Sequence, residues 1–121
     1  FKGIVKKTIQ LLKKNGCSEK DMIACIGPCI KKNNYEVKND FFKLFKEKNK
    51  KNVNFFTFKK KKIYFDLSEY IKSQFYENGV KKIDIIRKDT YALENNFFSS
   101  RRSKKNKHND YGRNISAIMI K

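Results

Sequence analysis

The sequence predicts a mixed α/β fold in which helices and strands intermix along one domain. Amphipathic segments with helical spacing alternate with short apolar runs that end at glycine, proline or charged residues. The chain has 121 residues, enough for one domain and too few for two of ordinary size. Its hydrophobic fraction of 39% and charged fraction of 35% are those of a chain that folds.

The first expected element is an amphipathic helix that ends at Asn15-Gly16, a pair suited to a left-handed helix stop. Its apolar residues recur with helical spacing and face lysines: Ile4, Val5, Thr8, Ile9, Leu11 and Leu12. No capping side chain precedes Ile4, so we expect the natural beginning of the protein to lie upstream. The apolar run Met22 to Ile26, bounded by Gly27-Pro28, predicts a buried strand that enters a turn.

A second helix is predicted to end near Glu47, with a polar loop from Glu47 to Asn54 after it. Four residues at spacings i, i+4, i+7 and i+8 should share its core-facing side: Val37, Phe41, Leu44 and Phe45. Next, residues 55–58 and 63–65 predict two strands around the basic turn Lys59 to Lys62.

A third helix should begin after Asp66, whose carboxylate can cap it, and end at Asn78-Gly79. Its apolar residues are Leu67, Tyr70, Ile71 and Phe75. The segment Val80 to Ile86 then predicts a strand. The last third predicts a loop-rich segment from Asp89 to Asn96, followed by the run Phe97 to Arg102. A polar insertion through Tyr111 and a final strand from Asn114 to Ile120 complete the chain.

The net charge of +18 raises the question of a nucleic-acid partner, because clustered cations release counterions when they meet phosphates. The chain has 26 Lys against 4 Arg, whereas selection for phosphate contact favours the planar fork of arginine. We therefore attribute much of the charge to an A/T-rich coding composition and do not expect nucleic acid as the partner.

No apolar run approaches the roughly 18 residues that span a bilayer, and no secretion signal opens the chain. Three cysteines within 13 residues, namely Cys17, Cys25 and Cys29, make a poor disulfide framework. We expect a cytoplasmic protein with no membrane partner.

The cysteines and His108 invite comparison with a Cys3His zinc site, but their spacing is unlike that of the usual zinc motifs. His108 is the one histidine, and it lies in a charged segment, where a solvated side chain is expected. A catalytic pair of a nucleophile and a histidine base is therefore not expected in this chain. The chain alone does not encode a complete hydrolase.

Arginine is scarce, yet Arg101, Arg102 and Arg113 flank one expected loop. These side chains either form surface ion pairs with residues such as Asp110 or bind an anionic substrate through their fixed fork geometry. Gly27-Pro28 is likewise either an ordinary turn or a point where the backbone closely approaches a ligand. The pattern leaves both alternatives open.

Several segments in a fixed order give the chain a family resemblance. They are Ile26-Gly27-Pro28-Cys29-Ile30 with Tyr35-Glu36-Val37, Tyr64-Phe65-Asp66-Leu67, Asn78-Gly79-Val80, Phe97-Phe98-Ser99-x-Arg101-Arg102, and Gly112-Arg113. In this order and spacing the chain resembles the laccase-domain family, also called the multicopper polyphenol oxidase or YfiH-like family. The resemblance covers nearly the whole chain.

This resemblance implies a layered, sandwich-like α/β domain of which residues 1–121 are the C-terminal part. It also implies an enzyme that phosphorolyses purine nucleosides and deaminates adenosine, with zinc (copper in older descriptions) as cofactor. The family's metal ligands sit in motifs that would lie upstream of Phe1, so we expect the metal-binding half to be absent here and this fragment to be inactive alone.

The resemblance implies no catalytic or metal-binding residue in this chain, and a substrate-binding wall formed by Gly27, Pro28, Ser99, Arg101, Arg102 and Arg113. The expected partners are a purine nucleoside and phosphate, and a homodimer is left open. Two alternatives remain: a basic nucleic-acid-binding module that uses Lys59 to Lys62 and Lys104 to Lys107, or an inactive remnant of a decaying gene.

Overall fold

The computed structural model of the chain describes residues 3–119. Its helices are α1 (Ile4–Lys14), α2 (Asn39–Lys48), α3 (Leu67–Glu77) and α4 (Ser100–Lys105). Its strands are β1 (Ile23–Ile26), β2 (Glu36–Val37), β3 (Phe56–Lys59), β4 (Lys62–Phe65) and β5 (Lys82–Ile85). Three short 3-10 helices are η1 (Lys32–Asn34), η2 (Lys50–Phe55) and η3 (Leu93–Asn95). The mixed α/β class predicted from the sequence is confirmed.

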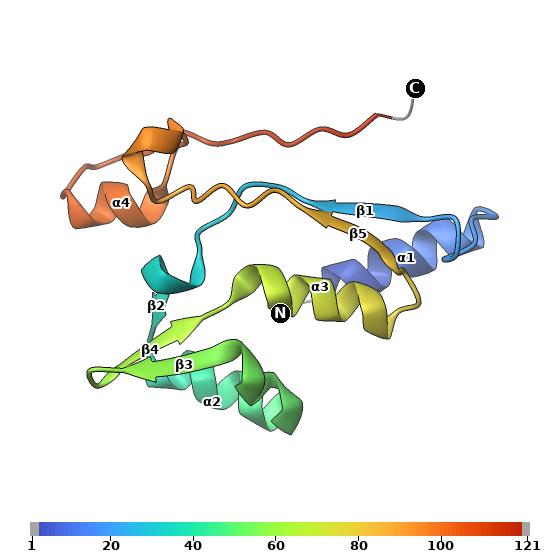
Figure 1. The fold of residues 1–121 in the computed structure, drawn as a ribbon, viewed down its shortest axis with the longest axis horizontal. Coiled ribbons are helices and arrows are strands. Elements are labelled where there is room, and N and C mark those ends of the chain that lie inside the picture. The colour runs from blue at the N-terminus through green and yellow to red at the C-terminus, as the bar shows by residue number, and fades with distance from the viewer. Residues whose placement is uncertain (1–2, 120–121) are drawn as a thin grey trace.

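The strands form two separate small sheets (Figure 1). β1 and β5 pair in parallel, with Ala24 opposite Ile83. β2, β4 and β3 form an antiparallel sheet in that order, which confirms the predicted hairpin around the lysine turn. A parallel pair needs a long crossover, and here the crossover contains the whole second sheet and both middle helices.

Helix α3 joins two layers, each of which contains one of the sheets, because its opposite ends pack in different hydrophobic clusters (Figure 1). Phe75, near its C-terminal end, packs on the cluster of Ile9, Ala24 and Val80 between α1, β1 and β5. Leu67 and Tyr70 pack on an aromatic cluster under the antiparallel sheet, whose buried members are Phe45, Phe56 and Phe65. The helix therefore fixes how the two layers are held together.

The aromatic cluster is the denser part of the core. Phe45 is 2% exposed, and its ring centroid lies 4.8 Å from that of Phe65 and 5.1 Å from that of Tyr70. Tilted and edge-to-face pairs at such distances stabilise by about 0.5–1.5 kcal/mol beyond the area they bury.

The predicted ends of α1 and α3 are confirmed. α1 has no side-chain N-cap, and Gly16 after it takes φ +89°. The carboxylate of Asp66 accepts the N–H of Glu69 at 3.2 Å and so caps α3. Gly79 follows α3 at φ +87°, a conformation that a side chain rarely adopts.

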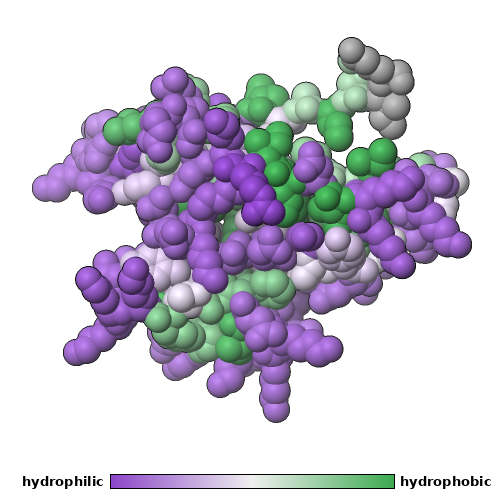
Figure 2. Space-filling model, viewed as in Figure 1, coloured by the Kyte–Doolittle hydropathy of each residue, from purple (hydrophilic) through white to green (hydrophobic). Residues whose placement is uncertain are grey.

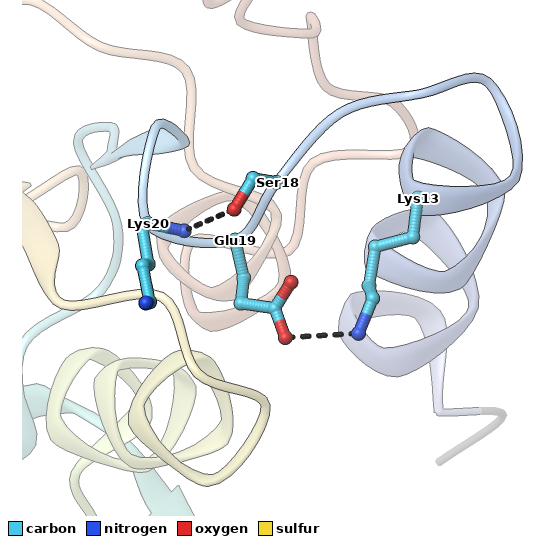
Figure 3. A network of polar contacts seen from close by, with 4 residues as sticks. All are labelled: Lys13, Ser18, Glu19 and Lys20. Carbon is cyan, nitrogen blue, oxygen red and sulfur yellow. Dashed lines mark hydrogen bonds and ion pairs between the residues drawn. The ribbon is translucent and has the colours of Figure 1, made fainter.

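The turn between α1 and β1 is held by short-range polar contacts (Figure 3). The ammonium of Lys13 lies 2.8 Å from a carboxylate oxygen of Glu19, and the backbone N–H of Lys20 donates to the hydroxyl of Ser18 at 3.4 Å. The hydrogen bond from Lys13 lowers the pKa of Glu19. Both partners are exposed, so the pair adds little stability.

Two details of the second helix differ from the prediction. Val37 lies in β2 and precedes α2, because its backbone pairs with Ile63 of β4. Leu44 is 52% exposed, while Phe41 and Phe45 pack inward as expected. The predicted loop after α2 contains η2, whose buried Asn52 donates to the carbonyl of Phe45 at 2.8 Å.

The predicted final strand is wrong for residues 114–119, and Ile120 lies outside the described residues. This segment runs extended above β1 (Figure 1), with Ile115 93% and Ile118 69% exposed. Its hydrogen bonds to the rest of the fold include two from a side chain, since the amide of Asn114 pairs with the backbone N–H and carbonyl of Phe98. An alternating apolar pattern becomes a strand only where a second backbone can pair with it.

Candidate functional site: a polar cleft beside α4

Arg101 and Arg102 lie on the short helix α4, not in the loop that the sequence predicted. The helix begins here because the buried hydroxyl of Ser99 accepts the backbone N–H of Arg102 at 3.3 Å. Neighbouring residues on a helix point about 100° apart, so the two guanidinium groups have different surroundings.

The guanidinium of Arg102 holds the preceding loop. Its Nη1 donates to the carbonyls of Thr90 and Tyr91 at 3.1 and 2.8 Å, and its Nη2 donates to the carbonyl of Phe97. These three acceptors belong to the two ends of the loop around η3. Arg102 therefore fixes the loop against α4, which uses up much of its donor capacity.

Arg101 is exposed and faces a cleft of about 1130 Å³ between α4 and the segment formed by η1, β2 and the start of α2. Its guanidinium carbon lies 5.4 Å from the ring centroid of Tyr35, a cation–π distance. The half-buried rings of Tyr64 and Tyr91 also line the cleft. Figure 2 shows hydrophilic residues on both rims of this hollow.

The charge of the cleft is strongly positive. Its cations are Lys38, Lys62, Arg101, Lys104 and Lys105, and its carboxylates are Glu36 and Asp40. Glu36 is neutralised because its carboxylate lies 2.8 Å from the ammonium of Lys62. That hydrogen bond raises the pKa of Lys62. The other cations of the cleft are therefore available to an anion.

Asp89 orders one wall of the cleft, a role that the sequence did not reveal. Its carboxylate accepts the backbone N–H groups of Lys31 at 3.3 Å and Tyr91 at 2.8 Å, and the side-chain amide of Asn34 at 2.7 Å. The loop that carries Tyr91 is thereby tied to η1. Tyr35 and Tyr64 occur in the segments that carry the family resemblance, and that was the one signal for the aromatic lining.

The other predicted site residues lie outside this cleft. An added Cβ on Gly27 would come 2.6 Å from the hydroxyl of Ser116, so this turn closely approaches the C-terminal segment. Pro28 is half-buried beside it. The guanidinium carbon of Arg113 lies 4.1 Å from the ring of Tyr111, and its Nη1 donates to the carbonyl of the same residue at 2.6 Å. The structure thus brings Arg101, Arg102 and Ser99 together and keeps Gly27, Pro28 and Arg113 apart from them.

The ion pairing considered for the arginines is not what the described residues show, since Arg102 and Arg113 donate to backbone carbonyls. Asp110 instead accepts the backbone N–H of Tyr111 at 2.7 Å.

The donors present do not fit a zinc ion. Within residues 3–119, no three His, Cys, Asp or Glu side chains gather where they could hold a metal. Cys17 and Cys25 are exposed, and burial raises the pKa of the Cys29 thiol, which opposes the thiolate form that zinc needs. We therefore assign no chemical step to a metal held by these residues.

The described helices include none that is long and apolar enough to cross a membrane.

A comparison with known protein families identifies the family of this chain. The sequence model of the family described as multi-copper polyphenol oxidoreductase laccase matches residues 1–121. The chain therefore belongs to this laccase-domain family, as its ordered motifs predicted.

Two curated relatives carry the name of an enzyme. A protein named purine nucleoside phosphorylase from Rickettsia prowazekii (strain Madrid E) is 36% identical over 104 residues. A second protein of that name from Rickettsia conorii (strain ATCC VR-613 / Malish 7) is 38% identical over 105 residues. Each match covers 84% of this chain and 43% of the relative, so the chain spans less than half the length of these relatives.

Proposed function

We propose that this chain supplies the substrate-binding wall of a purine nucleoside phosphorylase, and that the cleft beside α4 holds the nucleoside and phosphate. The observation that carries the proposal is the placement of the Arg101 guanidinium over the ring of Tyr35. The wall formed by η1, β2 and β4 thus offers the aromatic rings of Tyr35 and Tyr64 for a purine, and the facing wall, α4, offers a cation for phosphate. The names of the two relatives support this reaction class.

In phosphorolysis a phosphate oxygen forms a bond to C1′ of the ribose while the bond from C1′ to the purine nitrogen breaks. The leaving base takes up a proton, and ribose 1-phosphate remains. Phosphate must be stripped of water and aimed at C1′, which requires fixed cationic donors. In this proposal Arg101 binds phosphate, while Ser99 and Arg102 are positioning residues, since they hold α4 and its preceding loop.

Gly27, Pro28 and Arg113 take a second role in the proposal. They lie beside the C-terminal segment, so they would contribute to the substrate pocket only if the rest of the protein extends the cleft toward them. That residues 1–121 form the C-terminal part of one laccase-like domain also remains a prediction.

The test is the release of hypoxanthine from inosine by the whole protein, with phosphate varied. Arg101→Ala should raise the KM for phosphate about tenfold or more, since a charged hydrogen bond contributes about 1.5–3 kcal/mol. Lys46→Ala is the matched control, because Lys46 is exposed on α2 and lines no part of the cleft. Unchanged phosphate kinetics in Arg101→Ala would show that the assigned role is wrong.

Further measurements on the same protein test three expectations one by one: adenosine deamination, the identity of the metal and the oligomeric state. Adenosine deamination yields inosine without any need for phosphate, whereas phosphorolysis of adenosine yields adenine only when phosphate is present. Reloading the metal-free protein with zinc or copper in turn would identify the metal that supports each reaction. Sedimentation of the same preparation would establish whether the protein is a homodimer.

A further inference from the structure

A second basic hollow lies next to the cleft beside α4. It has a volume of about 550 Å³ and is lined by Lys32, Asn33, Thr57, Lys59, Lys60, Lys62 and Tyr64. Asn33, Lys62 and Tyr64 also line the first cleft, so the two hollows adjoin at these residues. We call the two together the basic groove. The lysine run at the β3–β4 turn and the lysines of α4 are far apart in sequence, yet both line it.

The lysines at the tip of the hairpin are held in an unfavourable backbone conformation. Lys60 and Lys61 have φ of +48° and +61°, the pattern of a two-residue type I′ turn. Such a turn is normally made by Asn-Gly, because a Cβ at positive φ crowds the neighbouring carbonyl. Strain of this kind persists only where the surrounding structure holds it, and it clusters at functional sites.

The size of the groove exceeds what a nucleoside needs. Sites for small ligands generally have volumes of about 300–1,000 Å³. The first cleft alone has about 1130 Å³, and the second hollow extends it. The groove therefore has room for a ligand longer than a single nucleoside.

The lining matches a chain of nucleotides. The rings of Tyr35, Tyr64 and Tyr91 line the first cleft, and Tyr64 also lines the second hollow. The ammonium of Lys105 lies 5.8 Å from the ring of Tyr91. Alternating aromatic rings and cations bind single-stranded nucleic acid, since every base has a face that stacks and every link has a charged phosphate. A duplex would present its bases to the inside and could not use the rings.

We propose that the basic groove binds single-stranded nucleic acid, with bases on the tyrosine rings and phosphates on the lysines of the hairpin tip and α4. This goes beyond the proposed phosphorolysis and does not depend on it. It departs from the expectation drawn from composition, because composition cannot show that two lysine runs converge on one aromatic groove.

The experiment measures fluorescence anisotropy of a labelled single-stranded oligonucleotide of mixed sequence with the whole protein over a range of salt concentrations. The groove variant Lys59→Gln/Lys60→Gln/Lys104→Gln/Lys105→Gln should bind at least tenfold more weakly at low salt. If all four lysines contact phosphates, the slope of log affinity against log salt should fall by about 3, at about 0.7 per contact. Tyr64→Ile should weaken binding about tenfold through lost stacking.

The control is Lys6→Gln/Lys7→Gln/Lys43→Gln/Lys46→Gln, four exposed helix lysines that line neither hollow. It removes the same charge from the chain and should retain most of the affinity. An equal loss in both variants would overturn the proposal, since binding would then follow net charge alone. An unaffected Tyr64→Ile variant, or equal binding of duplex and heparin, would also overturn it. Phosphorolysis rates of Lys59→Gln/Lys60→Gln report separately on the proposed enzyme, because these two lysines line the second hollow and not the cleft beside α4.

Discussion

Replacing Arg102 with alanine should weaken the fold much more than replacing its neighbour Arg101. The guanidinium of Arg102 donates three hydrogen bonds to the carbonyls of Thr90, Tyr91 and Phe97. Hydrogen bonds from charged donors contribute about 1.5–3 kcal/mol each when buried. The side chain is half-buried, so water would compensate part of the loss.

Taking roughly 1 kcal/mol for each of the three bonds, we expect Arg102→Ala to lower the free energy of unfolding by about 3 kcal/mol. Arg101 is exposed, and its contact with Tyr35 at 5.4 Å contributes about 0.5–1 kcal/mol at most. Arg101→Ala is therefore the matched control, with the same change of residue type on the same helix.

Urea unfolding of the whole protein measures both free energies, and similar m values would show that the two variants unfold to the same extent. Hydrogen exchange at residues 90–97 should rise in Arg102→Ala and stay low in Arg101→Ala. If the two variants lose equal stability, or if exchange in the loop is unchanged, Arg102 does not hold the loop as described.

Three further predictions follow from the backbone and the thiols. Asp66→Ala should lower the free energy of unfolding by about 1 kcal/mol, because α3 loses its N-cap. Asp66→Asn should retain most of the stability, since an asparagine oxygen can also accept the capping hydrogen bond. Equal urea midpoints for the two variants would contradict the cap. Burial raises the pKa of Cys29, so a smaller fraction of this thiol is thiolate at about pH 8. Iodoacetamide should therefore label Cys29 more slowly than the exposed Cys17, and the difference between the two labelling rates should narrow as pH rises. Equal labelling rates near pH 8 would refute this prediction. Replacing Lys60-Lys61 with Asn-Gly should raise the free energy of unfolding by about 1–2 kcal/mol, as followed by thermal unfolding, and should weaken oligonucleotide binding. An unchanged free energy of unfolding would mean that the turn is not strained.

The raised pKa of Cys29 also has a consequence for stability. A thiol with a higher pKa in the folded state than in the unfolded state favours folding below the unfolded-state pKa. This contribution is lost as pH rises through the folded-state pKa, because the unfolded protein then gains more from losing the proton. Tyr70 shifts in the same direction through burial, so stability should fall at alkaline pH.

The sequence by itself determined the local elements whose signals are short-range. Helical spacing with Asp66 before it and Asn78-Gly79 after it predicted α3, and the structure shows the carboxylate cap and the positive φ of the glycine. The hairpin was predicted in the same way, from two apolar runs around a basic turn. Family membership also came from the sequence, because ordered motifs persist even where each one is weak.

Only the tertiary structure decided the features that depend on distant partners. An apolar pattern predicted a strand in the C-terminal segment, but a strand needs a second backbone to pair with. From their motif, Arg101 and Arg102 were predicted to have the same role, whereas the helix directs one side chain to the cleft and the other to the loop. The convergence of the lysine runs at β3–β4 and α4 likewise depends on how α3 holds the two layers, which no local pattern encodes.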